Sequence, residues 1–139
     1  MGLVYAEIEL VNSIDAGMHK RGFIKETEIR REKVKALVDS GAYMMCINEN
    51  LKNQLSLDHS SFETAQMADG SLKKVEIVGP LHVRFLNRLT SCLAMVMPGD
   101  SEVLLGAIPM EGLDVVIDPL LQTLALPPGR PYMAQKSAK

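Results

Sequence analysis

The stretch Val34-Lys35-Ala36-Leu37-Val38-Asp39-Ser40-Gly41-Ala42 decides how this chain folds and what it does. Apolar residues alternate with other residues along its first half, which predicts a strand that becomes buried towards its end. The strand runs directly into an acid, a small hydroxyl residue and a glycine. Much later, Val103-Leu104-Leu105-Gly106 repeats the pattern of an apolar strand followed by glycine. Together these segments predict a catalytic acid at the end of a β-strand, with a second apolar strand packed beside its loop.

The bulk composition sets limits on the class of protein. A length of 139 residues fits one domain, and 47% hydrophobic residues are enough to form a core. Aromatic residues make up only 4%, so aliphatic residues and nine methionines must fill that core. The net charge of -2 gives no electrostatic reason to expect a nucleic-acid partner.

The cysteines and the N-terminus bear on the compartment. Cys46 and Cys92 resemble neither a disulfide framework nor a zinc site, so we expect free thiols in a reducing compartment. The three histidines are scattered without ligand spacing, and no metal site is expected. Residues 1–7 reach an acid too early for a secretory signal. No apolar run approaches the length of a membrane span. We therefore expect a cytoplasmic protein without a membrane partner.

The hydrophobic pattern along the chain is mainly that of short strands. Strands are expected at residues 4–10, 34–38, 81–85, 92–97, 103–105, 115–117 and 122–126, and in both arms of a hairpin over 64–78. The strand at 115–117 is expected to be buried. Residues 12–22 are predicted to form a loop. A short helix is predicted from Asn48, a plausible N-cap, to Leu55, and a helical turn near residues 109–113.

The hairpin over residues 64–78 carries Asp69-Gly70 at its tip. This dipeptide favours a type I′ turn, in which both central residues have positive φ. Gly79-Pro80 is expected to break the second arm. An alternative for Asp69-Gly70 is a plain hairpin turn with no further role.

Nine or so short strands with one or two short helices predict an all-β domain. We expect a closed, mostly antiparallel β-barrel over residues 1–126. Residues 127–139 begin with a proline-rich stretch and are expected to form a flexible C-terminal tail.

One acid is insufficient for acid–base hydrolysis of an amide, which needs a carboxylate pair that shares one proton. The chain contains a single Asp-Ser-Gly. The partner acid must therefore come from a second copy, with a two-fold axis between two Asp39 side chains. The alternative for Asp39 is an ordinary turn, because Asp, Ser and Gly are common turn formers.

Three segments carry a resemblance to a known family: residues 37–42, the hairpin Met67-Ala68-Asp69-Gly70-Ser71, and Leu104-Leu105-Gly106. Their order and spacing resemble those of the retropepsin-like aspartic proteases of clan AA, and more closely the bacterial single-domain type. The resemblance extends from about Leu3 to Leu126. It implies an aspartic endopeptidase that acts as a homodimer on a peptide or protein substrate, with water as the nucleophile and no cofactor.

The resemblance also implies roles for individual residues. Asp39 would be the catalytic aspartate, and Ser40 would replace the more usual threonine and bond across the dimer. Gly41 and Ala42 would line the cleft floor and hold the substrate backbone. Ala68, Asp69 and Gly70 would form a flap over the bound peptide. Leu104-Leu105-Gly106 would be the strand that threads beside the catalytic loop.

Two departures from the viral pattern stand out. Residues 107–111 lack the Arg-Asp or Arg-Asn that viral members place at the start of their helix, and the flap is followed by Lys73-Lys74. These departures leave two other functions open. One is a peptide-binding or dimerisation module without proteolysis, since a fold does not fix its function. The other is a monomer whose site assembles only on a larger partner.

Overall fold

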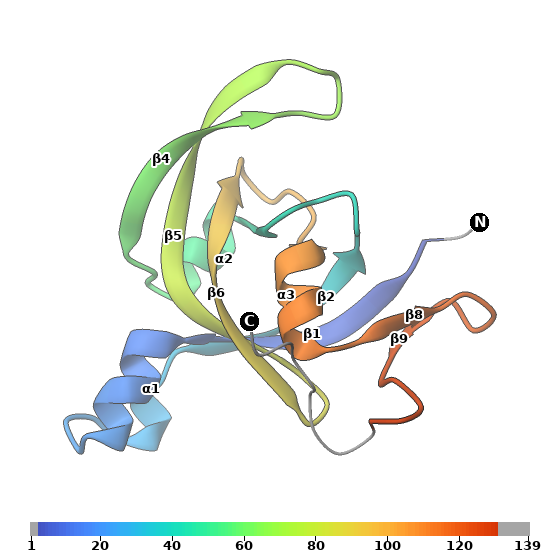
Figure 1. Ribbon diagram of the computed structural model, residues 1–139. Coiled ribbons are helices and arrows are strands. Elements are labelled where there is room, and N and C mark those ends of the chain that lie inside the picture. Colours follow the sequence, from blue (N-terminus) through green and yellow to red (C-terminus); the bar gives the residue numbers. More distant parts are fainter. Residues whose placement is uncertain (1–2, 131–139) are drawn as a thin grey trace, which may run out of the picture.

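The computed structural model describes residues 3–130, and most of its elements are strands (Figure 1). The nine strands of this range are β1 Tyr5–Asn12, β2 Arg31–Val38, β3 Met45–Asn48, β4 His59–Gln66, β5 Leu72–Phe85, β6 Arg88–Met97, β7 Leu104–Leu105, β8 Val116–Asp118 and β9 Thr123–Ala125. The helices are α1 Ser13–Lys20, α2 Glu49–Gln54 and α3 Ala107–Leu113, with a 3₁₀ turn, η1, at Glu26–Glu28. The expected all-β class is therefore confirmed.

Seven strands are hydrogen-bonded in the order β1-β2-β7-β3-β6-β5-β4, and β1 also pairs with β5. The first six strands thus form a ring of pairings, and β4 lies outside it on β5. The pairings β2–β7 and β3–β6 are parallel and the others are antiparallel, as expected of a mostly antiparallel sheet. Strands β8 and β9 form a separate two-stranded sheet.

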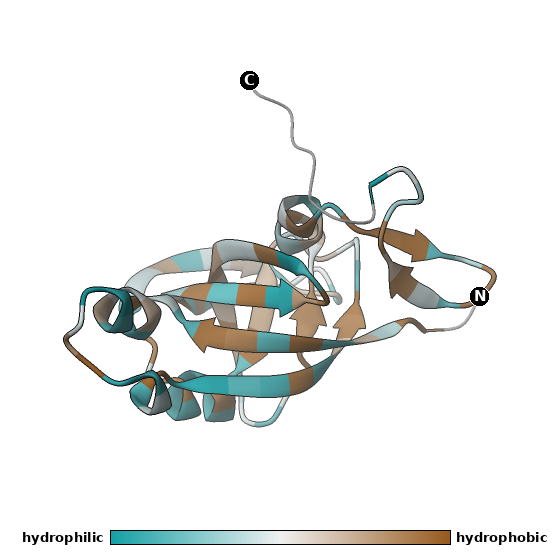
Figure 2. Cartoon of the chain, turned by 90° about the horizontal axis from the view of Figure 1, so that it is seen from below, coloured by the Kyte–Doolittle hydropathy of each residue, from teal (hydrophilic) through white to brown (hydrophobic). Residues whose placement is uncertain are grey.

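The core lies inside this ring because successive side chains along a strand point to opposite faces. In β1 the buried residues include Ala6, Ile8 and Leu10, and in β5 they include Leu81 and Val83. Figure 2 shows the same alternation as bands of apolar and polar residues along the strands. Aliphatic residues and methionine fill the core, and Met45 is completely buried.

Residues 13–20 form helix α1, so the loop predicted for residues 12–22 is wrong. Asn12 caps the helix, because its Oδ1 accepts hydrogen bonds from the backbone N–H groups of Ile14 and Asp15. Its Nδ2 donates to the carbonyl of Leu55 at 2.9 Å. The Asp15 carboxylate binds the guanidinium and the backbone N–H of Arg30, and so joins the two ends of the segment between β1 and β2. The helix is short and contains Gly17, so its composition is that of a loop and the sequence pattern did not predict it.

Two strand predictions also need correction. Gly79-Pro80 does not end the second hairpin arm, because β5 continues from Leu72 to Phe85 with a register shift against β6 between Val78 and Leu81. The segment at 115–117 is not a buried strand: Val116 is 41% exposed and Ile117 is 39% exposed. Strands β8 and β9 form a separate two-stranded sheet outside the main sheet, and this leaves Val116 and Ile117 in contact with solvent.

The C-terminal part of the described chain is held by a buried arginine. The Arg88 guanidinium is 1% exposed and donates to the carbonyls of Leu113 and Asp114 and to the Asp114 carboxylate. Arg88 also donates to the carbonyl of Arg130, whose own guanidinium binds Asp114 at 2.7 and 2.8 Å. Residues 127–130 thus pack on the domain, whereas the rest of the expected tail lies outside the described residues. None of the helices within residues 3–130 is long and apolar enough to cross a membrane.

Candidate active site

Asp39 follows the last residue of β2, at the point where that strand runs parallel to β7. Leu37 pairs with Leu104 and Val38 pairs with Leu105. The Asp39 backbone N–H donates to the Leu105 carbonyl at 3.0 Å and extends this pairing by one residue. The strand expected to thread beside the acid is therefore present.

The loop after Asp39 is held by backbone hydrogen bonds. The N–H of Ala42 donates to the Asp39 carbonyl at 3.1 Å, and the N–H of Ala107 donates to the Ala42 carbonyl at 2.8 Å. Ile108 donates in the same way to the carbonyl of Tyr43 at 2.9 Å. The Gly41 N–H donates to Oδ1 of Asp39 at 2.9 Å, which fixes the direction of the carboxylate.

Gly106 lies directly against this loop. A Cβ atom on Gly106 would be 2.2 Å from the Met44 carbonyl oxygen and 2.8 Å from the Ala42 carbonyl oxygen. Both contacts are with backbone, which cannot rotate away as a side chain could. A residue without a side chain is therefore required for the loop to sit on the segment between β7 and α3.

The other residues predicted for the loop differ in what they can offer a substrate. Ser40 and Gly41 are exposed, and Ala42 is half-buried. Ala42 uses both its N–H and its carbonyl within the loop, so it offers a peptide chiefly its methyl group. The Gly41 carbonyl accepts no hydrogen bond from residues 3–130 and remains available for a substrate N–H.

The β4–β5 hairpin ends in a tight tip at Met67–Ser71. The Gly70 N–H donates to the Met67 carbonyl at 2.9 Å, and the Met67 N–H donates to the Ser71 carbonyl at 2.8 Å. Only Gly70 has positive φ, at 87°, so the expected type I′ turn is wrong. One left-handed glycine after the turn matches a three-residue hairpin loop instead. The reason is that Asp69 accepts hydrogen bonds from the N–H and hydroxyl of Ser71, which stabilise this tip and lower the pKa of Asp69.

The hairpin tip and the loop after β2 extend towards the same end of the molecule (Figure 1). Ala68, Asp69 and Gly70 are all exposed at this tip. Glu76 of β5 attaches the base of the hairpin to the rest of the domain. Its carboxylate accepts a hydrogen bond from Lys52 Nζ of α2 at 2.6 Å and contacts His59 Nδ1 at 2.7 Å. These two partners lower the pKa of the Glu76 carboxyl.

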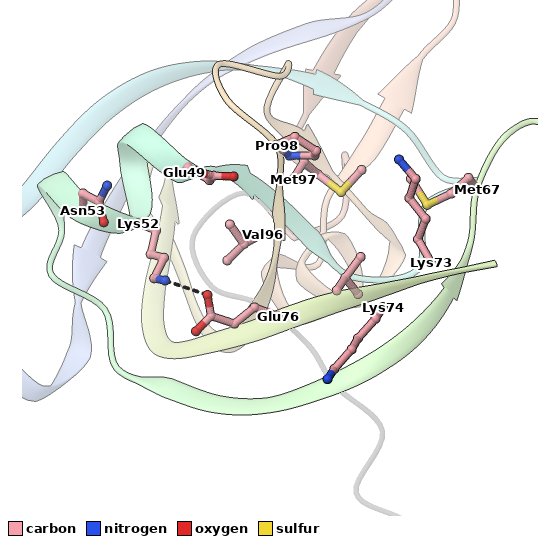
Figure 3. A pocket seen from close by; sticks show the side chains of 11 residues that line it. Glu49, Lys52, Asn53, Met67, Lys73, Lys74, Glu76, Val96, Met97 and Pro98 are labelled. Carbon is pink, nitrogen blue, oxygen red and sulfur yellow. Dashed lines mark hydrogen bonds and ion pairs between the residues drawn. The ribbon is translucent and has the colours of Figure 1, made fainter. Parts of the chain in front are cut away.

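A pocket of about 270 Å³ lies between the hairpin, α2 and the end of β6 (Figure 3). Val75, Val96 and Met97 contribute apolar surface, and Met67 and Lys73 line it from the hairpin. No residue of the loop 39–44 lines this pocket. It is therefore adjacent to the hairpin and distinct from the surroundings of Asp39.

Cys46 is the titratable group whose pKa responds to Asp39. Its thiol is free, as expected from the sequence, and buried, and it donates a weak hydrogen bond to the Met44 carbonyl. Burial, together with the nearby Asp39 carboxylate, raises the pKa of Cys46 to about 11. A protonated thiol at this position leaves Asp39 as the acidic group of the loop. Within residues 3–130, no three His, Cys, Asp or Glu side chains are placed to hold a metal ion.

Sequence reasoning missed the apolar residues around the loop. Tyr43 is 75% exposed and Leu3 is 67% exposed, although both are large. Ile108, whose backbone binds that of Tyr43, is 39% exposed. Exposure of single residues cannot be read from periodicity in loops, because no regular alternation applies there.

The acid at the end of β2, the hairpin and the glycine after β7 define the class of the retropepsin-like aspartyl proteases. Residues 26–109 match the model of the family described as gag-polyprotein putative aspartyl protease, and the chain belongs to this family. The match covers more than half of the chain and includes Asp39, the whole hairpin and Gly106. No curated protein matches the chain.

Proposed function

We propose that the protein is a homodimeric aspartic endopeptidase in which two Asp39 carboxylates, one from each copy, activate a water molecule. The observation that carries this proposal is the loop itself. Asp39 is oriented by the Gly41 N–H and supported from below by Gly106. Membership of the aspartyl protease family gives the general activity, and the ring of strands would form the closed barrel expected for it.

A dimer is needed because the chain has only one Asp-Ser-Gly. Exposed apolar side chains, some at the loop and others on the turn between β8 and β9, support such an association. We define the apolar edge as Leu3, Tyr43, Ile108, Leu120 and Leu121. Leu3 precedes Val4, whose carbonyl binds the N–H of Val38, and β9 lies against β1. Leu120 and Leu121 are 92% and 72% exposed between β8 and β9. Exposed apolar surface of this kind is typical of a site of association.

The chemistry follows from two carboxyl groups held close together. Two carboxyl groups at short distance cannot both ionise readily. The pair would therefore hold one proton in the pH range between its two apparent pKa values. The ionised Asp39 would take a proton from water as it attacks the peptide carbonyl. The protonated Asp39 would donate to the carbonyl oxygen, and a proton would then pass to the leaving amine.

The remaining predicted site residues would bind the substrate and close the site. The Ser40 hydroxyl would bond across the dimer axis and hold the two loops together. The Gly41 carbonyl would accept a substrate N–H, and the Ala42 methyl would contact the peptide. Ala68, Asp69 and Gly70 would close over the peptide as a flap, which excludes water from the reaction.

The test is cleavage of a diverse peptide library between pH 4 and pH 7 by the wild-type protein and by Asp39→Asn. We expect cleavage by the wild type with a pH profile set by a coupled carboxylate pair, and no cleavage by the variant. Sedimentation at several concentrations would report the dimer in both proteins. A wild-type dimer that binds peptides and cleaves none would contradict the proposal and favour a binding module.

A further inference from the structure

We propose that Lys73 selects substrates that carry a glutamate side chain in the segment flanking the cleaved bond. This inference rests on the proposed function, because it assumes that a peptide lies beneath the hairpin. It assigns a role to the pocket of Figure 3, which the reaction at Asp39 does not use.

The pocket begins beside the expected course of the peptide. Met67 belongs to the hairpin tip, and Pro98 belongs to the loop between β6 and β7. Glu49 and Lys52 of α2 line its other end. A peptide held under the tip would therefore leave the site past Met67, and one of its side chains could enter this pocket.

Three lysines and two glutamates line the pocket, and the exposed Glu49 lies on α2 while Lys73 lies on the hairpin. Lys52 and Glu76 form a salt bridge with each other at 2.6 Å. Lys73 makes no salt bridge with any residue of the range 3–130, and it is exposed. Its charge does help to lower the pKa of Asp69, but that carboxylate is already bound by Ser71. Lys73 can therefore bind a carboxylate supplied by another molecule.

The neighbouring Lys74 also lines the pocket, but its ammonium group lies over an aromatic ring outside the pocket lining. Successive side chains of β5 alternate between faces, and Lys74 lies with its ammonium group 4.4 Å from the centroid of the Phe62 ring. Figure 3 shows the Lys73 side chain running beside Met67, and that of Lys74 extending away from it. Lys74 is thus a matched control that carries the same charge one residue away.

The shape of the pocket favours glutamate among acidic side chains. Met67, Met97 and Val96 offer apolar surface along which two methylene groups can pack. The carboxylate at the end of such a side chain would reach the ammonium group of Lys73. Aspartate, which is one methylene shorter, would leave part of that apolar surface uncovered.

Binding can be tested without cleavage by using full-length Asp39→Asn. The probes are fluorescent ten-residue peptides with a fixed apolar centre, in which each flanking position in turn is Glu, Asp, Gln or Lys. We expect one position at which Glu binds about three- to tenfold more tightly than Gln, the range typical of a single partly exposed charged contact. Addition of Lys73→Gln should abolish this preference, and addition of Lys74→Gln should retain it. Lys73→Glu should instead favour the Lys peptide.

The inference would be overturned if no position prefers Glu, or if the preference survives Lys73→Gln. Binding and cleavage are separate readouts here. If the wild type cleaves peptides without a preference for Glu, the proposed function stands and the role of Lys73 fails. If the wild type cleaves none, while Asp39→Asn shows a Glu preference that depends on Lys73, the recognition stands and the proteolysis fails.

Discussion

At the scale of single residues, the Asp39 loop depends on a contact that leaves no room for a side chain. The loop is attached to β7 and α3 by backbone hydrogen bonds, and Gly106 lies between these two elements. Asp39 would carry out the proposed chemistry, and the absence of a side chain at Gly106 allows the loop that holds Asp39 to pack against the segment between β7 and α3.

Gly106→Ala is expected to destabilise the protein by about 3 kcal/mol or more, because its methyl group would overlap two backbone carbonyl oxygens. Urea unfolding followed by circular dichroism would measure the loss. Gly17→Ala is the matched control: a Cβ there meets nothing within 4 Å, and alanine favours the helix by about 1 kcal/mol. Equal stability of Gly106→Ala and the wild type would contradict the assigned contact.

The thiol of Cys46 reports on the charge of Asp39. Burial is the main cause of its raised pKa, and the Asp39 carboxylate adds to it. In a Cys92→Ala background, Asp39→Asn should therefore lower the pKa of Cys46 from about 11 without restoring its ordinary value. The rate of alkylation as a function of pH would give both values. A Cys46 pKa that is unchanged by Asp39→Asn would place the two groups too far apart to interact.

At the scale of elements, the hairpin and α2 are joined through Glu76. Lys52 comes from α2 and His59 from the start of β4, so one carboxylate links three elements. The same carboxylate lies at the root of the proposed flap, where it limits how the hairpin can move against the body.

Glu76→Gln is expected to lower the free energy of unfolding by about 1 kcal/mol at pH 7, since the carboxylate has two polar partners. The pKa of Glu76 is lower in the folded state than its ordinary value of 4.5. Its stabilising contribution is therefore complete above about pH 4.5 and is lost as the pH falls through the folded-state pKa.

Urea unfolding at pH 7 and pH 3 would check this, and the difference between Glu76→Gln and the wild type should shrink at pH 3. Glu63→Gln, at an exposed position of β4, should show almost no difference at either pH. A difference for Glu76→Gln that is equal at both pH values would exclude the charge as its cause.

Regular alternation was the part of the fold that the sequence predicted well. The strands at Tyr5–Asn12 and Arg31–Val38 and the cap at Asn48 follow from local patterns. Helix α1 and the exposure of Val116 do not, because both depend on contacts between distant segments. The link from Glu76 to Lys52 and His59 was missed for the same reason. Asp39 could be singled out because its strand and turn are contiguous in the chain, and the strand beside it was expected from the repeated pattern of strand and glycine and from the family resemblance. The close contact of Gly106 with the Ala42 and Met44 carbonyls joins distant segments and could not be read from local pattern.

At the scale of the whole molecule, the exposed apolar residues gather at particular places. The turn between β8 and β9 and helix α1 lie on different sides of the molecule (Figure 1). Leu120 and Leu121 belong to that turn, and Phe23 follows α1 and donates its N–H to the Met18 carbonyl. The proposed dimer uses the first of these surfaces and leaves the second free.

Leu120→Asp is expected to shift the protein from dimer to monomer and to reduce cleavage at least tenfold, because a charge in an apolar contact is costly. Sedimentation velocity would measure the association, and circular dichroism would show that the fold remains. Phe23→Asp, at a residue that is 72% exposed, should leave the dimer intact. A dimer that tolerates Leu120→Asp would place the interface elsewhere.

The pairing of β2 with β7 also has a consequence for how the enzyme is made. Leu37 can meet Leu104 only after the whole segment between them has left the ribosome, and the loop at Asp39 is also held by Ala107 and Ile108, which come later still. Such long-range pairings form late in folding. A nascent chain would therefore expose its acid without the geometry needed to use it until residues 104–108 have emerged, so the proposed activity cannot begin before that point.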